Sequence, residues 1–268
     1  MTKIQGVSVH KTEGYSVFWV SELAEDLKAA IRSRLSAVCH GAANAESGSE
    51  MYCYKSTLKE FLKRYSSKSE RQKKGILGEL LLHILLSTFH EEYDVNSPFF
   101  NLEERSVKKG FDIVLNKKGT SDIWIAESKA GELHARKNST QTIIELINTA
   151  QDDLYERLNG DSFSLWQNAI HGARVAISDK RDDRAAIVEI LQNHGVSANN
   201  EDMSSDTMNV ILAGTVFSDI SVPVDSERIK DRHLQIKSSA KFKDVYLIAI
   251  QKSTYTKIYD FLVGESNL

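Results

Sequence analysis

The sequence predicts a mixed α/β protein in which a central sheet is flanked by helices. Short runs rich in β-branched and aromatic residues recur along the chain, and segments with apolar residues at helical spacing lie between or after them. Strands that are separated by helices in this way are typical of α/β sheets. We therefore expect the strands to form one mixed sheet.

The expected strands are the runs with this β-branched and aromatic character. They lie at 15–20, 111–115, 123–126, 174–178, 208–217 and 245–250. Residues 116–121 have the composition of a hairpin loop, so the strands on either side of them should pair in antiparallel fashion. The polar stretch 194–206 is expected to form a loop.

The expected helices follow from apolar periodicity. They lie at 21–38, 56–65, 70–89, 139–158, 180–194 and 253–263. Ser21 is expected to cap the first of them. The helix at 70–89 is apolar over most of its surface, so we expect it to pack across the sheet.

Length and composition exclude several classes of protein. The 268 residues can bury a sizeable core, and 41% hydrophobic with 26% charged residues is ordinary for a soluble globular protein. The sequence shows no signal-peptide pattern at its start and no apolar run near the length that spans a bilayer, so we expect a cytoplasmic protein. Cys39 and Cys53 form no C-x-x-C pair, so a disulfide framework or a zinc site is not expected.

The expected hairpin carries the most informative charged residues. If it closes symmetrically about Gly119, Asp112 lies opposite Glu127 with β-carbons roughly 4.5–5.5 Å apart. Like charges in this position destabilise a bare sheet, so a divalent cation such as Mg²⁺ or Mn²⁺ between them explains the pair. Lys129 shares the face of Glu127, and the carbonyl of Ser128 is a candidate additional metal ligand. The alternative is an exposed hairpin with incidental charges.

These residues resemble the PD-(D/E)xK nuclease superfamily, whose motif Asp112, Glu127 and Lys129 match. Many members carry a glutamate on a helix before the motif, as Glu79 does here. The Gln-x-x-x-Tyr of RecB-like members is matched by Gln151 and Tyr155, although these two can equally be ordinary boundary residues of a helix.

More narrowly, the segments 110–115 and 123–129, in a chain of this size, resemble the HamA family, the nuclease subunits of the Hachiman anti-phage system. The resemblance implies a restriction-endonuclease-like core at 66–268 that includes a C-terminal α/β extension, after an N-terminal α/β accessory region at 1–65. It also implies a bacterial defence effector that degrades DNA in a stable complex with a helicase subunit, HamB.

The resemblance also assigns a role to each motif residue. Asp112 and Glu127 would hold Mg²⁺ or Mn²⁺, and Glu79 would add direct or water-mediated coordination. Lys129 would orient an attacking water and stabilise negative charge on the phosphate. Gln151 and Tyr155 would position the lysine or the DNA backbone. Nothing in this set reads bases, so we expect weak sequence preference.

The distribution of charge allows nucleic-acid binding only locally. The net charge of −3 gives no global reason to expect it, but the stretch 55–74 contains eight basic residues against two acidic ones. The candidate DNA contacts in it are Lys63, Arg64, Lys68, Arg71, Lys73 and Lys74. A solvated helix face is the alternative. A second basic stretch at 228–243 is equally ambiguous and can instead face a protein partner.

Other chemistries have no support in the sequence. It contains no P-loop, no G-x-S-x-G elbow and no closely spaced His pair, so ATP-driven work would need a partner. His83 lies one turn after Glu79 and belongs either to the core or to the edge of the site. Two rival functions stay open: a restriction- or repair-type endonuclease without a helicase, and a non-catalytic subunit with a nuclease fold.

Overall fold

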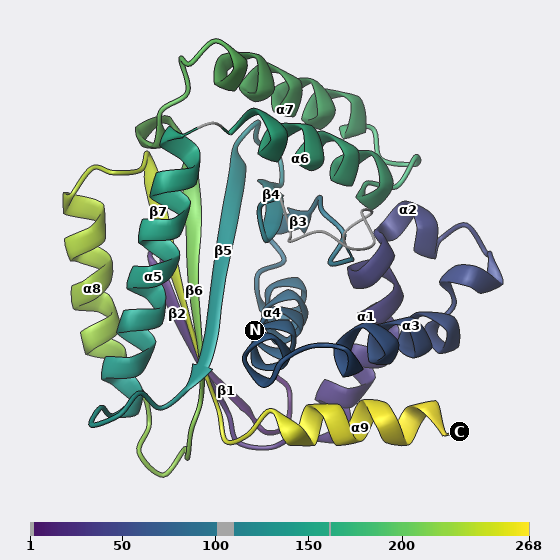
Figure 1. Ribbon diagram of the computed structural model, residues 1–268, viewed down its shortest axis with the longest axis vertical. Helices are drawn as coiled ribbons and strands as arrows, with labels where there is room; N and C mark the ends of the chain where they lie inside the picture. Colours follow the sequence, from purple (N-terminus) through teal and green to yellow (C-terminus); the bar gives the residue numbers. More distant parts are fainter. Residues whose placement is uncertain (1–2, 101–109, 161, 268) are drawn as a thin grey trace.

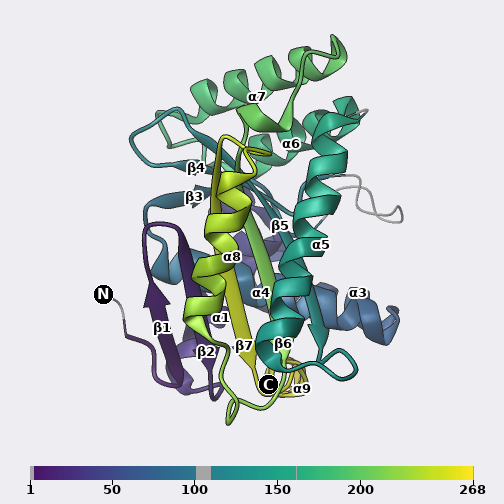
Figure 2. The ribbon, with the colours of Figure 1, turned by 90° about the vertical axis from the view of Figure 1, so that its left-hand side faces the viewer.

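The computed structural model describes residues 3–100, 110–160 and 162–267. In this part of the chain one seven-stranded sheet has helices on both faces, as Figure 1 and Figure 2 show. The order of the strands is β1-β2-β7-β6-β5-β4-β3. The predicted class, a mixed α/β sheet flanked by helices, is confirmed.

The strands are β1 (Val7–Lys11), β2 (Tyr15–Val20), β3 (Tyr93–Val95), β4 (Ile113–Lys117), β5 (Ile123–Glu132), β6 (Asn209–Phe217) and β7 (Asp244–Lys252). The central strands β2, β7, β6 and β5 run parallel to one another. The outer strands β1, β4 and β3 each pair in antiparallel fashion. Strands from the beginning and the end of the described chain are therefore neighbours in one sheet.

The helices are α1 (Glu25–His40), α2 (Ala42–Ala45), α3 (Tyr54–Ser66), α4 (Glu70–Phe89), α5 (Ser139–Asn159), α6 (Phe163–Ala176), α7 (Arg184–Asn199), α8 (Ser226–Ser238) and α9 (Thr256–Ser266). Short 3-10 turns lie at Glu50–Tyr52 and Ser205–Thr207. Of the helices that the structure describes, none combines the length and the apolar character needed to cross a membrane.

The two faces of the sheet bury separate apolar clusters. The helices α1, α3, α4 and α9 pack on one face, and α5, α6, α7 and α8 contribute to the cluster on the other. Along β5, Trp124 and Ala126 belong to the α4 face, whereas Ile123 and Ile125 belong to the α5 face. Because side chains alternate along a strand, Glu127 points to the α5 face.

Several predicted elements need correction. The expected strand at 174–178 is wrong, because Arg174 belongs to the last turn of α6, whose buried Trp166, Ala169 and Ala173 recur at helical spacing. The expected loop at 194–206 is wrong in its first half, since α7 continues to Asn199. The helix expected from 21 begins at Glu25 after Ala24, which offers no side-chain cap. The strands β1 and β3 and the helices α2, α6 and α8 were not predicted.

Candidate active site

The hairpin of β4 and β5 brings Asp112 to Glu127. Ile113 pairs with Ala126, so the next step of the same register sets Asp112 against Glu127. Gly119 supplies the positive φ of 74° in the connecting loop. The Asp112 carboxylate accepts a hydrogen bond from the backbone N–H of Ser128 at 2.8 Å. Since the N–H and C=O of one strand residue point to the same edge, the Ser128 carbonyl lies on the Asp112 side.

Glu127 is a buried carboxylate, only 2% exposed. Its Oε1 accepts a hydrogen bond from Lys129 at 2.7 Å, and its Oε2 forms an ion pair with Arg157. Burial raises the pKa of Glu127, and the nearby negative charge of Asp112 raises it further. Arg157 and Lys129 act in the opposite direction without reversing the shift. Two carboxylates therefore lie close together where one of them is buried, and nearby cations are needed to stabilise their negative charge.

Lys129 lies between two carboxylates from different elements. Its Nζ is 2.7 Å from Oε1 of Glu127 on β5 and 2.7 Å from Oδ2 of Asp153 on α5. Burial by itself lowers the pKa of this lysine, but the charge of Glu127 and the hydrogen bonds to Asp153 and Glu127 outweigh it, so the pKa is raised. The ammonium group thus stays charged at neutral pH.

The structure adds two residues that the motif did not include, Asp153 and Arg157 of α5. They are four residues apart and so lie on one side of the helix, the side that meets Glu127 and Lys129. Arg157 also donates to the backbone carbonyls of Gly110 at 3.2 Å and Asp153 at 3.3 Å. The spacing Asp-x-x-x-Arg was the signal in the sequence that could have revealed them.

Gln151 and Tyr155 of α5 contact residues away from Glu127 and Lys129. The buried Gln151 accepts a hydrogen bond from Arg232 of α8 at 2.9 Å. Tyr155 packs edge-on against Phe242, and the Lys241 ammonium lies 4.7 Å from its ring centre. These contacts join α5 to α8 and to the segment before β7. The expected role of the two residues in positioning Lys129 or DNA stays a prediction.

Glu79 lies on α4, next to the point where this helix meets the sheet. The preceding Gly78 lies so close to Ala130 that an added β-carbon would be 2.4 Å from the Ala130 methyl group. Ala130 shares its face of β5 with Ala126, whereas Glu127 faces α5. Within the described ranges, no three His, Cys, Asp or Glu side chains form a group that could hold a metal ion. The structure therefore does not join Glu79 to Asp112 and Glu127 in such a group, and its role as a ligand stays a prediction.

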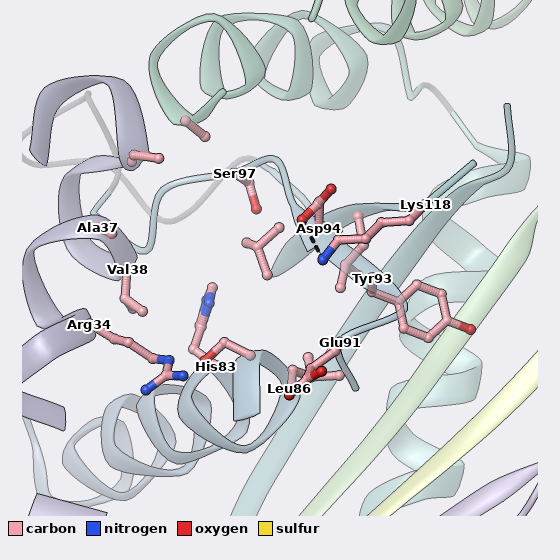
Figure 3. A pocket seen from close by; sticks show the side chains of 16 residues that line it. Arg34, Ala37, Val38, His83, Leu86, Glu91, Tyr93, Asp94, Ser97 and Lys118 are labelled. Atoms are coloured by element: carbon pink, nitrogen blue, oxygen red, sulfur yellow. Dashed lines mark ion pairs between the residues drawn. The ribbon is translucent and has the colours of Figure 1, made fainter. Parts of the chain in front are cut away.

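His83 lines a cavity on the α4 side of the sheet. The cavity has a volume of about 240 Å³ and lies between α1, α4 and β3, with Arg34, Leu86 and Tyr93 among its lining residues. Figure 3 shows His83 directed into it from α4. The imidazole also packs edge-on against Phe99. His83 thus belongs to the core of the α4 face rather than to the carboxylate site.

A sequence model of the HamA family matches residues 7–263, from the first residue of β1 into α9. The chain belongs to the HamA family. None of the curated proteins compared with it matches. Membership of the HamA family implies a component of the Hachiman defence system and partnership with HamB.

The donor set suits the metal that the nuclease resemblance implies for a HamA protein. Mg²⁺ is usually held by one or two carboxylates and keeps several waters, and Mn²⁺ accepts the same hard oxygen ligands. Asp112 and Glu127 supply two carboxylates, and the Ser128 carbonyl lies on the same edge of β5. Burial raises the pKa of Glu127 and the charge of Asp112 raises it further, and a divalent cation would relieve this repulsion between the two carboxylates.

The six basic residues proposed for DNA binding divide into two groups. Ion pairs join Arg64 to Glu60, Lys73 to Glu70 and Lys74 to Glu132. Lys63, Lys68 and Arg71 are exposed, and the described residues offer them no ion-pair partner. Glu132 lies five residues beyond Glu127 on β5, which is about 17 Å along the strand. Lys74, the last residue of the basic stretch, thus lies near the carboxyl end of β5.

Proposed function

We propose that this HamA-family protein is a Mg²⁺- or Mn²⁺-dependent nuclease that hydrolyses DNA phosphodiesters with little sequence preference, and that its helicase partner restrains it. The observation that carries this proposal is the meeting of the half-buried Asp112 and Lys129 with the buried Glu127. A restriction- or repair-type enzyme without a helicase fits the same chemistry, but partnership with HamB favours the defence complex.

Each residue of the site has a defined task in this proposal. Asp112, Glu127 and the Ser128 carbonyl would hold the metal, which supplies Lewis-acid polarisation of the phosphate when bound. Lys129, kept charged by its two carboxylate contacts, would orient an attacking water and stabilise negative charge on the phosphate. Asp153 would fix the position of the Lys129 ammonium through its 2.7 Å contact. Glu79 would contribute to metal binding through a bound water.

DNA would reach this site along the basic stretch. Lys63, Lys68 and Arg71 are exposed and can contact phosphates, which gives affinity without reading sequence. Lys74 connects this stretch to the end of β5 through its ion pair with Glu132. Glu132 faces α4 and Glu127 faces α5, so a track from there to Glu127 would run about 17 Å along β5 and pass around the strand edge where its pairing with β4 ends at Ala126.

Restraint by the partner follows from the lack of sequence readout. A nuclease with this site and no base recognition would damage the DNA of its own cell if it acted freely. The sequence has no P-loop, so ATP-dependent sensing of abnormal DNA would come from the HamB subunit.

Substitutions in the site test the nuclease assignment. Glu127→Gln should lower Mn²⁺-dependent cleavage of plasmid DNA by about 100-fold or more, because a buried carboxylate ligand is lost, and Lys129→Met should do the same because the charge that stabilises the phosphate is lost. The matched control is Lys180→Met, an exposed lysine at 83% whose ion pair with Glu46 is remote from β5. Wild-type cleavage rates in a folded Glu127→Gln or Lys129→Met protein would contradict the assigned site.

The restraint by the helicase needs a separate experiment. The chain co-expressed with HamB should elute with it in size exclusion, and the complex should cut intact plasmid more slowly than the chain alone does. Equal cutting with and without HamB would reject the restraint while leaving the nuclease assignment in place.

A further inference from the structure

The guanidinium group of Arg157 forms an ion pair with Glu127, one of the two carboxylates proposed to bind the metal. Arg157 extends from α5 and forms an ion pair with Oε2 of Glu127. The Arg157 side chain is 29% exposed and the Glu127 side chain is 3% exposed. The same guanidinium donates to the Gly110 carbonyl, two residues before Asp112. Arg157 therefore ties together the segment that carries Asp112 and the carboxylate of Glu127.

Both carboxylate oxygens of Glu127 are engaged by cations. Lys129 holds Oε1 and Arg157 holds Oε2. Each of these oxygens has two lone-pair sites, so a divalent cation that binds Glu127 would share an oxygen with Lys129 or Arg157 and lie close to that like charge. The two cations differ in what else holds them. Lys129 has a second anionic partner in Asp153, whereas the remaining contacts of Arg157 with the described residues are with neutral carbonyl oxygens.

We infer that Arg157 is an internal counter-ion that competes with the divalent metal for Glu127 and gives way when the metal binds. A buried carboxylate without a counter-charge is strongly destabilising, so the metal-free site needs this cation. A divalent ion between Asp112 and Glu127 replaces that charge, and the arginine then leaves Oε2. The inference rests on the proposed function of the site and adds to it a residue of α5 that sets metal affinity.

The test is calorimetric titration of the full chain with Mn²⁺. Arg157→Gln removes the competing charge and should bind Mn²⁺ with a Kd about 10-fold lower than wild type. The same variant should melt at a lower temperature without metal and recover when Mn²⁺ is added, because Glu127 then regains a cation. The control is Arg184→Gln, which removes an arginine paired with Asp179 at the start of α7 and should change neither value.

The outcomes separate this inference from the nuclease proposal. An unchanged or weaker Mn²⁺ affinity in Arg157→Gln, with binding lost in Glu127→Gln, would overturn the role of Arg157 and leave the metal site standing. Absence of Mn²⁺ binding in the wild type would overturn both.

If the Arg157→Gln variant does not fold, a measurement on the wild-type chain tests the same inference. In the wild-type chain the side-chain Nε–H resonance of Arg157 should shift when Mg²⁺ is titrated, because its contact with Glu127 is released. No shift at saturating Mg²⁺ would overturn the inference.

Discussion

Two ionisable side chains are buried in the sheet, and they differ in whether an opposite charge lies beside them. Glu127 is surrounded by the cations of Lys129 and Arg157. Lys252, at the end of β7, is fully buried, and the contact of its Nζ within the described chain is with the hydroxyl of Ser253 at 3.5 Å. Burial, with a smaller effect of the Lys257 charge, lowers the pKa of Lys252 to about 8. The first arrangement suits a site that exchanges cations, and the second is a cost to stability.

Lys252→Met should therefore stabilise the protein at neutral pH. The folded-state pKa of about 8 lies below the unfolded value of about 10.4, so the wild type carries the full penalty below pH 8 and loses it as the pH rises to about 10.4. The variant should be more stable by about 1–3 kcal/mol at pH 7, with the difference shrinking above pH 10. Urea unfolding at both pH values measures this. The control, Lys63→Met at an exposed position, should show no such dependence.

The residues of the site differ in how far sequence alone could predict them. Asp112 and Glu127 were predictable because a short hairpin fixes its register and side chains alternate along a strand. Asp153 and Arg157 were harder, because the apolar stripe of α5 around Leu154 has a polar row on each side. One row contains Gln151 and Tyr155, and the other contains Asp153 and Arg157. Which row meets β5 and which meets α8 depends on tertiary packing.

At the scale of elements, α4 shows how closely a helix can approach the sheet. Its limits matched the predicted 70–89, since Ser69 forms a capping box with Gln72 and the apolar run is long. Gly78 then lets α4 come against Ala130 of β5. In contrast, 174–178 was misread as a strand because a short run of β-branched and apolar residues at a helix end resembles a strand.

This close approach predicts opposite effects for two glycines of α4. Gly78→Ala should destabilise the protein by about 1–3 kcal/mol, because its new methyl group would lie 2.4 Å from that of Ala130. Gly75→Ala, where nothing lies within 4 Å, should stabilise it by about 0.5–1 kcal/mol through helix propensity. Chemical denaturation measures both. Adding Ala130→Gly to the Gly78→Ala variant should restore most of the loss, and no recovery would contradict the packing argument.

At the scale of the whole molecule, the sheet joins distant parts of the sequence. Tyr15–Val20 of β2 pairs in parallel with Leu247–Lys252 of β7, and Figure 1 shows these strands side by side. Local patterns predicted that β2, β6 and β7 exist, but periodicity carries no information on which strands become neighbours. Residues proposed as an accessory region at 1–65 thus supply two strands of the same sheet as the carboxylate site and two helices, α1 and α3, of its α4-face core.

This topology decides how the HamB interface can be mapped. Deletion of residues 1–21 should abolish cooperative thermal unfolding, because it removes the fully buried Val17, Phe18 and Val20 and leaves β7 without its ladder partner on one side. Loss of HamB binding in such a truncation would therefore report unfolding rather than a lost contact.

Charge reversal at exposed positions of the same region, Lys55→Glu with Lys59→Glu on α3, should keep the wild-type melting temperature. If α3 contacts HamB, this double variant, unlike the truncation, will stay folded and co-elute less with HamB. A truncated chain that still unfolds in one cooperative transition and binds HamB would show that β1 and β2 are dispensable, against the sheet order described here.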